Sequence, residues 1–275
     1  MSTRGQHPSA QTDNVEWFTS GARYWHHVYR SMTLDAQIYR RRLWTSISWL
    51  DELGLPPQPT VLDVGCGAGH LTVALARCGA RVIASDFSTQ MTGMTQDQIR
   101  VEGLAAPVVR ADAHGLPFRD GAFHLAVGLG LLPWVRYPQA VLTELRRVTR
   151  PGGYVLVSFD NSDRLFRLTD PLLTPPVQPL RRLVRRARGR SRRESHTQRG
   201  NRFVHPRRAR EAVESAGLHV TRTASVGFGP PTFFDRAVGP ASLAMSIDTA
   251  LQRHADKDVS LLSGLGAHYL VLARH

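Results

Sequence analysis

The chain has 275 residues, enough for one large α/β domain or two small ones whose core needs no disulfide bonds. Its two cysteines, Cys66 and Cys78, make neither a disulfide framework nor a zinc-binding pattern, and the residues offer no clustered ligands for a metal. The longest uncharged apolar run, 125–135, is too short to cross a bilayer. Residues 1–14 lack the apolar stretch of a secretory signal and predict a flexible tail. These features favour a cytoplasmic protein with reduced thiols.

The positive charge is concentrated in one segment. The formal net charge is +13, and residues 162–210 hold 15 arginines against three acids, Asp163, Asp170 and Glu194. The rest of the chain is therefore close to neutral, and any electrostatic partner is expected to bind this segment and not the fold as a whole.

Residues 15–55 predict an N-terminal helical cap. Aromatic and apolar residues recur there at spacings of three and four, over 15–32 and again over 34–54, where Gly54 and the prolines after it end the second helix. Tyr24 and Trp25 in this cap are candidates to close over a bound ligand, although core packing is their simpler role.

Short strands then alternate with helices. The β-branched and apolar runs predict five strands, at 60–65, 81–86, 107–112, 123–130 and 154–159. Ser88 is a suitable N-cap for a helix that runs to about Glu102. Such alternation predicts a doubly wound, mostly parallel sheet with helices on both faces.

The alternation is interrupted twice. Residues 160–205 form an arginine-rich insertion, and residues 229–266 a second one with a helix predicted near 241–255. A helix at 206–217 and strands at 219–229 and 268–274 complete seven strands. We therefore expect one domain over 56–275 whose two insertions act as helical lids.

The stretch "VLDVGCGAG" (61–69) predicts a ligand-binding turn after the first strand. Glycines at a strand-to-helix turn let the backbone approach a ligand, and the helix N-terminus offers free N–H groups. The dinucleotide pattern G-x-G-x-x-G would need glycine at position 70, which is His70. Asp86 ends the second strand, where a carboxylate can accept both hydroxyls of a ribose. Together they favour an adenosine ligand over a pyrophosphate.

From these motifs onward the chain resembles the class I S-adenosylmethionine-dependent methyltransferases, closely over 58–159 and more loosely over 206–225 and 268–274. "VLDVGCGAG", "ASDFS", "RADAHGLPF", "GAFHLAVGLGLL" and "LRRVTRPGGYVLVS" are similar to five family motifs in the family's order. The resemblance implies the Rossmann-like methyltransferase fold, S-adenosylmethionine as cofactor and S-adenosylhomocysteine as product. It implies that the cofactor-binding residues are Asp63, Gly65, Cys66, Gly67, Gly69, Asp86, Phe87, Met91, Asp112, Ala113 and Gly128.

Within that resemblance, the first motif wraps the methionine portion, Asp86 binds the ribose, Phe87 lies beside the adenine and Asp112 reaches the adenine amino group. One departure is His124, which stands where the family usually has an acidic residue; that position is mostly structural. Methyl transfer is an in-line displacement, so the enzyme must align donor and acceptor and exclude water. The catalytic base stays unassigned among the histidines that could face the cleft, which are His26, His27, His70, His205 and His268.

The sequence predicts only the chemical class of the molecule that accepts the methyl group. "GLGLLPWV" replaces the Asn/Asp-Pro-Pro-aromatic motif of enzymes that methylate nucleobase amino groups, which makes nucleic acid a disfavoured partner. We expect O- or N-methylation of a small-molecule or lipid-like acceptor, in secondary or cell-envelope metabolism. Residues 181–193 are a solvated lid face, a site for an acidic partner or membrane surface, or a contact for RNA. The alternatives to the small-molecule enzyme are an RNA methyltransferase and a non-catalytic cofactor-binding protein; the oligomeric state is not predicted.

Overall fold

The computed structural model describes residues 21–166, 170, 202–233, 236–257 and 262–275. The predicted tail at 1–14, the start of the predicted cap and the arginine run at 181–193 lie outside the described residues. Within the described ranges, no helix combines the length and apolar character needed to cross a membrane.

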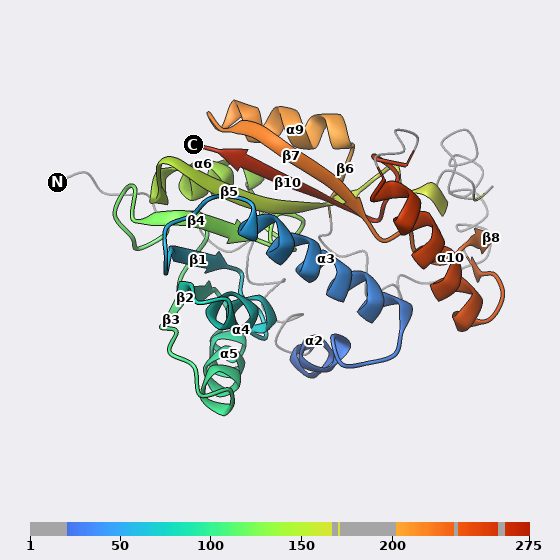
Figure 1. The fold of residues 1–275 in the computed structure, drawn as a ribbon, viewed down its shortest axis with the longest axis horizontal. Coiled ribbons are helices and arrows are strands. Elements are labelled where there is room, and N and C mark those ends of the chain that lie inside the picture. Colours follow the sequence, from blue (N-terminus) through green and yellow to red (C-terminus); the bar gives the residue numbers. More distant parts are fainter. Residues whose placement is uncertain (1–20, 167–169, 171–201, 234–235, 258–261) are drawn as a thin grey trace, which may run out of the picture.

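A single large sheet organises the chain (Figure 1). Its strands follow the order β3-β2-β1-β4-β5-β10-β7, and β10 runs antiparallel to both of its neighbours while the other described pairs along this path are parallel. The strands are β1 (Thr60–Val64), β2 (Arg81–Asp86), β3 (Val108–Arg110), β4 (Phe123–Gly128), β5 (Thr149–Asn161), β7 (His219–Val226) and β10 (His268–Arg274). The predicted mostly parallel sheet with these seven strands is therefore confirmed, and an eighth strand joins it.

Three short strands were not predicted. The two-residue β6 (Phe203–Val204) pairs with the end of β5, and β8 (Thr232–Phe233) pairs with β9 (Arg236–Ala237) away from the main sheet. β3 is also shorter than predicted, with three residues in place of six. Pairs this short carry too little side-chain periodicity to be seen in a sequence.

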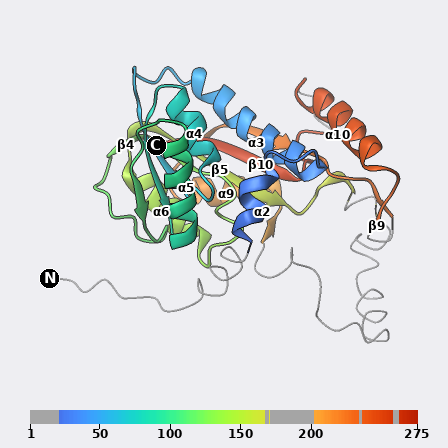
Figure 2. The ribbon, with the colours of Figure 1, turned by 90° about the horizontal axis from the view of Figure 1, so that it is seen from below.

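Helices cover both faces of the sheet, as predicted (Figures 1 and 2). Alternate residues of β1 point to opposite faces: Val61 packs with α3 (Leu34–Asp51) and α4 (His70–Arg77), whereas Leu62 packs with α6 (Pro138–Val148) and α9 (Pro206–Ser215). α5 (Thr89–Val101) lies beside α4 and against β2. The buried strands are apolar on both sides because both sides are covered.

The N-terminal cap consists of α2 (Ala22–Val28) and α3. Thr33 caps α3 by accepting a hydrogen bond from the Ala36 N–H, and Leu43, Ile47 and Trp49 bury its apolar face against the sheet. This packing places the N-terminal half of α3 over the carboxyl ends of the central strands.

The second insertion holds α10 (Ala241–Ala255), where a helix was predicted (Figure 2). Two fully buried polar side chains attach it to the end of β7. Asp248 accepts from the Phe228 N–H (2.6 Å) and from the Gln37 amide (2.8 Å), and Gln252 accepts from the Gly227 N–H (2.8 Å). Burying a carboxylate is costly unless donors satisfy it, so these bonds determine where α10 docks.

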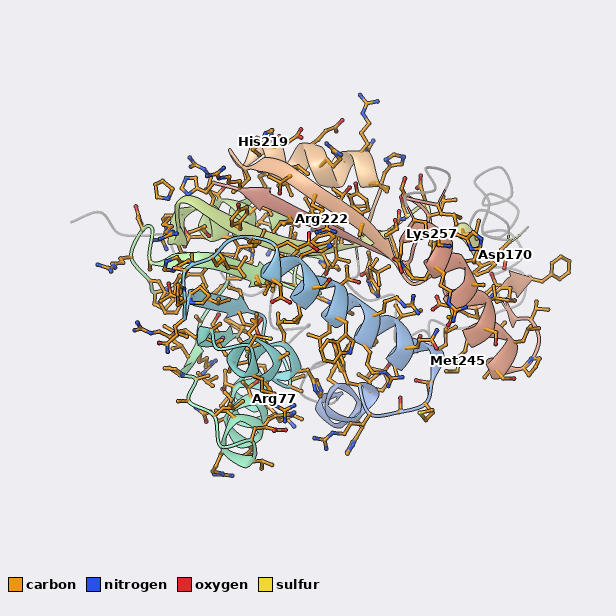
Figure 3. The ribbon with its side chains drawn as sticks, in the orientation of Figure 1. Arg77, Asp170, His219, Arg222, Met245 and Lys257 are labelled. Atoms are coloured by element: carbon orange, nitrogen blue, oxygen red, sulfur yellow. The ribbon has the colours of Figure 1, made fainter. Side chains whose placement is uncertain are left out.

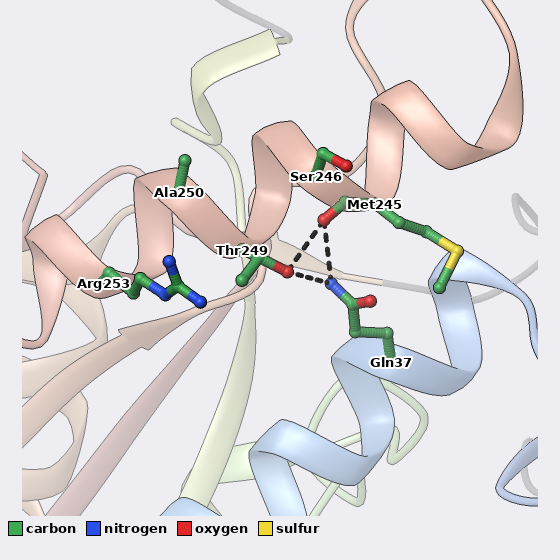
Figure 4. Close-up of a pocket in the computed structure, with 6 residues that line it drawn as sticks. All are labelled: Gln37, Met245, Ser246, Thr249, Ala250 and Arg253. Carbon is green, nitrogen blue, oxygen red and sulfur yellow. Dashed lines mark hydrogen bonds between the residues drawn. The ribbon is translucent and has the colours of Figure 1, made fainter.

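An open hollow of about 310 Å³ lies between α3 and α10, lined by Gln37, Met245, Ser246, Thr249, Ala250 and Arg253 (Figure 4). The Gln37 amide nitrogen spans it and donates to the Met245 carbonyl, the Thr249 hydroxyl and Asp248. Because this amide is fully engaged in joining two helices, we assign it a structural role.

Asp248→Ala should lower the free energy of unfolding by about 2–3 kcal/mol, because it leaves the buried Phe228 N–H and the Gln37 amide without their acceptor. Urea denaturation measures the change. Ser246→Ala on the same helix is the control: among the described residues this exposed hydroxyl bonds to the Ser242 carbonyl alone, and its loss should change stability by less than about 0.5 kcal/mol. Equal effects of the two substitutions would contradict the docking role of Asp248.

Candidate functional site

The turn between β1 and α4 is built from three glycines in the left-handed region. Gly65, Gly67 and Gly69 have φ values of 72°, 55° and 83°, which only glycine adopts without strain. A Cβ atom added to Gly65 would lie 3.0 Å from Leu131, and one added to Gly69 would lie 3.1 Å from Thr95. A Cβ atom added to Gly67 would have no neighbour within 4 Å. Gly67 therefore presents bare backbone to open space, as a ligand cradle requires.

Asp63 supports this turn from within the protein. Its side chain is buried, and one carboxylate oxygen accepts from the Thr72 hydroxyl on α4 at 2.6 Å. Burial raises the pKa of the Asp63 carboxyl to about 7, although the Thr72 hydrogen bond opposes the shift. Asp63 thus connects the end of β1 to α4, and this connection holds the intervening glycine turn in position.

Asp86 connects the turn to the second strand. One carboxylate oxygen accepts from the Gly67 N–H at 3.0 Å and the other from the Ser88 N–H at 2.9 Å. Burial raises the pKa of Asp86, and these backbone hydrogen bonds counter it. Each carboxylate oxygen has two lone pairs, so both can still accept a ribose hydroxyl. Asp86 lies at the end of β2, where the sequence predicts the ribose contact.

α5 forms one wall of the turn. The Thr95 hydroxyl donates to the Gly67 carbonyl at 2.8 Å and lies 3.5 Å from the Cys66 sulfur. Burial raises the pKa of the Cys66 thiol, so it stays protonated and unreactive and serves as a small residue of the turn. Met91 is 2% exposed and belongs to the same wall. Thr72 and Thr95 were not predicted, because their roles depend on how α4 and α5 pack against the glycine turn.

The predicted adenine residues lie after β2 and β3. The Ala111 N–H donates to the Asp86 carbonyl, which keeps the two strand ends together. Asp112 accepts from the backbone N–H of His114 at 2.9 Å and contacts its Nδ1 at 2.7 Å. Ala113 is buried. The Cζ atom of Arg110 lies over the Phe87 ring, 5.7 Å from the centre of that ring. His114 is a neighbour of Asp112 that sequence reasoning missed.

The fourth-strand motif lies on the other side of the glycine turn, next to β1. Gly128 ends β4, and a side chain there would contact Leu131 at 3.3 Å, the same leucine that packs on Gly65. Gly130 has φ 72°, and the Arg42 guanidinium from α3 packs directly on it. At the opposite end of β4, His124 accepts a hydrogen bond from the Thr60 N–H. This contact is structural, which agrees with the structural role expected where His124 replaces the family's acidic residue.

The five histidines that are candidates for the catalytic base lie in different environments. His70 begins α4 and stacks on Tyr29 at 4.2 Å, and His268 pairs with Asp160 at 3.0 Å. His205 caps α9 and pairs with Asp163, while His27 is exposed. The side chain of His26 lies outside the described residues. Tyr24 and Trp25 join the aromatic cluster of the cap: Trp25 contacts both Tyr24 and Tyr39 edge-on.

Comparison with known proteins agrees with this geometry. Residues 62–157 match a family model described as a methyltransferase domain. A demethylmenaquinone methyltransferase of Beutenbergia cavernae is 41% identical over 118 residues, which are 42% of this chain and 47% of that protein. A ubiquinone/menaquinone biosynthesis C-methyltransferase of Cupriavidus taiwanensis is 33% identical over 119 residues, 42% of this chain and 49% of that protein. The chain thus spans about half the length of the curated relatives that it matches.

Solved structures extend the similarity to the whole fold. Magnesium protoporphyrin IX methyltransferase of Synechocystis PCC 6803, solved with bound SAH, superposes with a TM-score of 0.64 at 16% identity and covers 97% of this chain and 100% of its own. Residues 62–157 thus resemble a methyltransferase domain, and the solved structure shares the fold of the whole chain. The resemblance found in the sequence is confirmed.

Gly69→Ala should destabilise the protein by about 1–2 kcal/mol, since alanine at φ 83° is strained and its Cβ would crowd Thr95. Gly93→Ala, in the middle of α5 with nothing within 4 Å, is the matched control and should stabilise it by about 0.5–1 kcal/mol. Thermal unfolding of both variants measures the difference. If Gly69→Ala left the stability unchanged, the turn would have to adopt another conformation.

The raised pKa of Asp63 predicts a pH-dependent stability. The carboxyl binds its proton more tightly when folded than when unfolded, so the contribution is largest at low pH and is lost as pH rises through about 7. Between pH 5 and pH 8, the wild type should lose about 2.5 kcal/mol relative to Asp63→Asn, which cannot ionise. Urea denaturation at the two pH values tests this, and parallel stability curves for the two proteins would refute it.

Proposed function

We propose that the chain is a methyltransferase that binds S-adenosylmethionine in the turn at Gly65–Gly69 and transfers its methyl group to a small-molecule acceptor. The observation that carries the proposal is the pairing of an open, left-handed Gly67 with the partly buried Asp86 carboxylate. The glycines leave room for the methionine end, and Asp86 supplies the two acceptors that a ribose diol needs. The methyltransferase family match over 62–157 supports the same cofactor.

The remaining predicted residues have compatible positions. We assign Phe87, Asp112 and Ala113 to the adenine, since they follow β2 and β3 on the side of Asp86 away from the glycines. Asp63, Cys66 and Met91 hold the turn and its α5 wall, and Gly128 gives close approach at β4. The described residues hold no cluster of three metal-ligating side chains, and we propose a mechanism of alignment and proton removal.

For the acceptor, the named relatives support a small, quinone-like or phenolic molecule, because those proteins are called ubiquinone and menaquinone methyltransferases. Fold similarity alone would not support methyl transfer: the [4+2]-cyclase SpnF has the same fold, with a TM-score of 0.59 and 17% identity. Product mass after incubation with S-adenosylmethionine and candidate quinols separates the enzyme from a non-catalytic cofactor-binding protein.

The arginine run at 181–193 supports a second, separable proposal, an acidic or membrane partner for a cytoplasmic enzyme; RNA is the alternative. Its charge is the only support. Binding to anionic vesicles that disappears when 181–193 is deleted would favour the membrane partner, and steeply salt-dependent binding to RNA would favour the alternative.

Asp86→Ala should weaken the binding of S-adenosylhomocysteine by about 1.5–3 kcal/mol, the contribution of hydrogen bonds to a charged group. Isothermal titration calorimetry measures it. Asp97→Ala, an exposed carboxylate on α5, is the control and should bind as the wild type does. Unchanged affinity in Asp86→Ala would remove the ribose assignment.

A further inference from the structure

A histidine–aspartate pair lies at the carboxyl edge of the sheet, on the side covered by α3. His268 is the first residue of β10 and stands opposite Asp160 near the end of β5. The His268 Nδ1 is 3.0 Å from a carboxylate oxygen of Asp160, and the two side chains are 13% and 15% exposed. The pair is therefore sheltered but open to a bound molecule.

This pairing leaves the other ring nitrogen to act as a base. When Nδ1 donates to a carboxylate, the neutral imidazole carries its lone pair on Nε2. The carboxylate also stabilises the imidazolium that forms when Nε2 takes a proton. A sheltered histidine oriented in this way has the properties of a general base.

The pair lies near the proposed methyl donor. β4 separates β1, which leads into the glycine turn, from β5, and neighbouring strands lie about 4.8 Å apart. The Gly130 N–H beyond β4 donates to Ser158 at 2.7 Å, two residues before Asp160 on β5. An aromatic path joins the two places: His70 at the turn contacts Tyr29, Tyr29 contacts Tyr39, and Tyr39 lies 5.7 Å from His268.

The surroundings of the pair favour an acceptor that becomes an anion. Arg42 is only 7% exposed, its Cζ lies 5.0 Å from the Tyr39 ring centre, and no described residue accepts a hydrogen bond from its Nε. The Tyr29 hydroxyl accepts from Arg42 at 3.4 Å, and the negative charge of Asp160 attracts the guanidinium, although no described carboxylate lies within salt-bridge distance of it. A buried cation in this position stabilises negative charge that develops beside it.

The class of acceptor follows from acidity and shape. A phenol has a pKa of about 10, within reach of an imidazole base, whereas an alkyl alcohol is far less acidic. The rings of Tyr29 and Tyr39 offer flat surfaces on which an aromatic acceptor can stack. The groups that face His268 are Asp160 from β5 and Tyr39 from α3, and its partner on β7 is the apolar Val226.

Building on the proposed methyl transfer, we propose that His268 is the general base that deprotonates a phenolic or enolic acceptor, and that Asp160 is its positioning residue. The proton moves from the acceptor oxygen to Nε2 of His268. The oxygen lone pair forms a bond to the methyl carbon, and the carbon–sulfur bond breaks with its electron pair left on sulfur. The products are the methyl ether, neutral S-adenosylhomocysteine and an imidazolium beside Asp160, which releases its proton to solvent.

A dead-end complex tests this without turnover. Full-length protein saturated with S-adenosylhomocysteine is mixed with 4-nitrophenol or the two-ring 4-nitro-1-naphthol, whose phenolates absorb visible light while the phenols do not. At a pH below the pKa of the free phenol, the wild type should show the phenolate band on binding. His268→Gln should reduce that band at least tenfold. Calorimetry on the same samples should show unchanged affinity for S-adenosylhomocysteine, which verifies that the variant is folded.

His219→Gln is the matched control. His219 begins β7 opposite Arg274, at the end of the sheet away from α10, and should leave the band unchanged (Figure 3). Asp160→Asn should shift the pH at which the band reaches half its maximum by about one unit, because the charge beside the imidazolium and the phenolate changes. A merely structural role for Asp160 would not move that pH.

The outcomes are distinct. A phenolate band that survives in His268→Gln, or no band in the wild type despite bound S-adenosylhomocysteine, overturns the assignment of His268 and its acceptor. An unmoved midpoint in Asp160→Asn overturns the positioning role. Absence of S-adenosylhomocysteine binding in the wild type overturns the proposed function itself.

Discussion

The site depends on the hydrogen bonds that the Asp86 carboxylate accepts from Gly67 and Ser88. They link the end of β1 to the end of β2 and to the first turn of α5, three pieces of chain that would otherwise move separately. The carboxylate is partly buried, and these donors favour its charged form against the desolvation that raises its pKa. The left-handed glycines are required for the same reason, since only they turn the Gly67 N–H toward Asp86.

Strand order determines what else reaches this edge. Because β1, β4 and β5 are parallel neighbours, their carboxyl ends meet beside the glycine turn. β10 is antiparallel to β5, so its first residue, His268, arrives at the same edge from the far end of the sequence. The cap helix α3 then covers the edge with Tyr39 and the buried Arg42. Residues more than 200 positions apart, such as Tyr39 and His268, thus meet at one edge of the sheet.

Local chemistry made part of this predictable. The glycine spacing, Asp86 at a strand end and the Ser88 cap depend on near neighbours in the sequence, and the structure places all three as expected. The contacts of Thr72, Thr95 and Arg42 depend on how helices pack, which no local pattern encodes. His268 was one histidine among several until strand pairing brought Asp160 beside it. The arginine run lies outside the described residues, so its role stays a prediction.

We propose that this chain binds S-adenosylmethionine through the Gly65–Gly69 turn and Asp86. A crystal structure of the full chain grown with S-adenosylhomocysteine tests it most directly. The account predicts both ribose hydroxyls on the Asp86 carboxylate and the methionine end over Gly67. A ligand bound elsewhere on the protein, or an empty turn at saturating ligand, would contradict it.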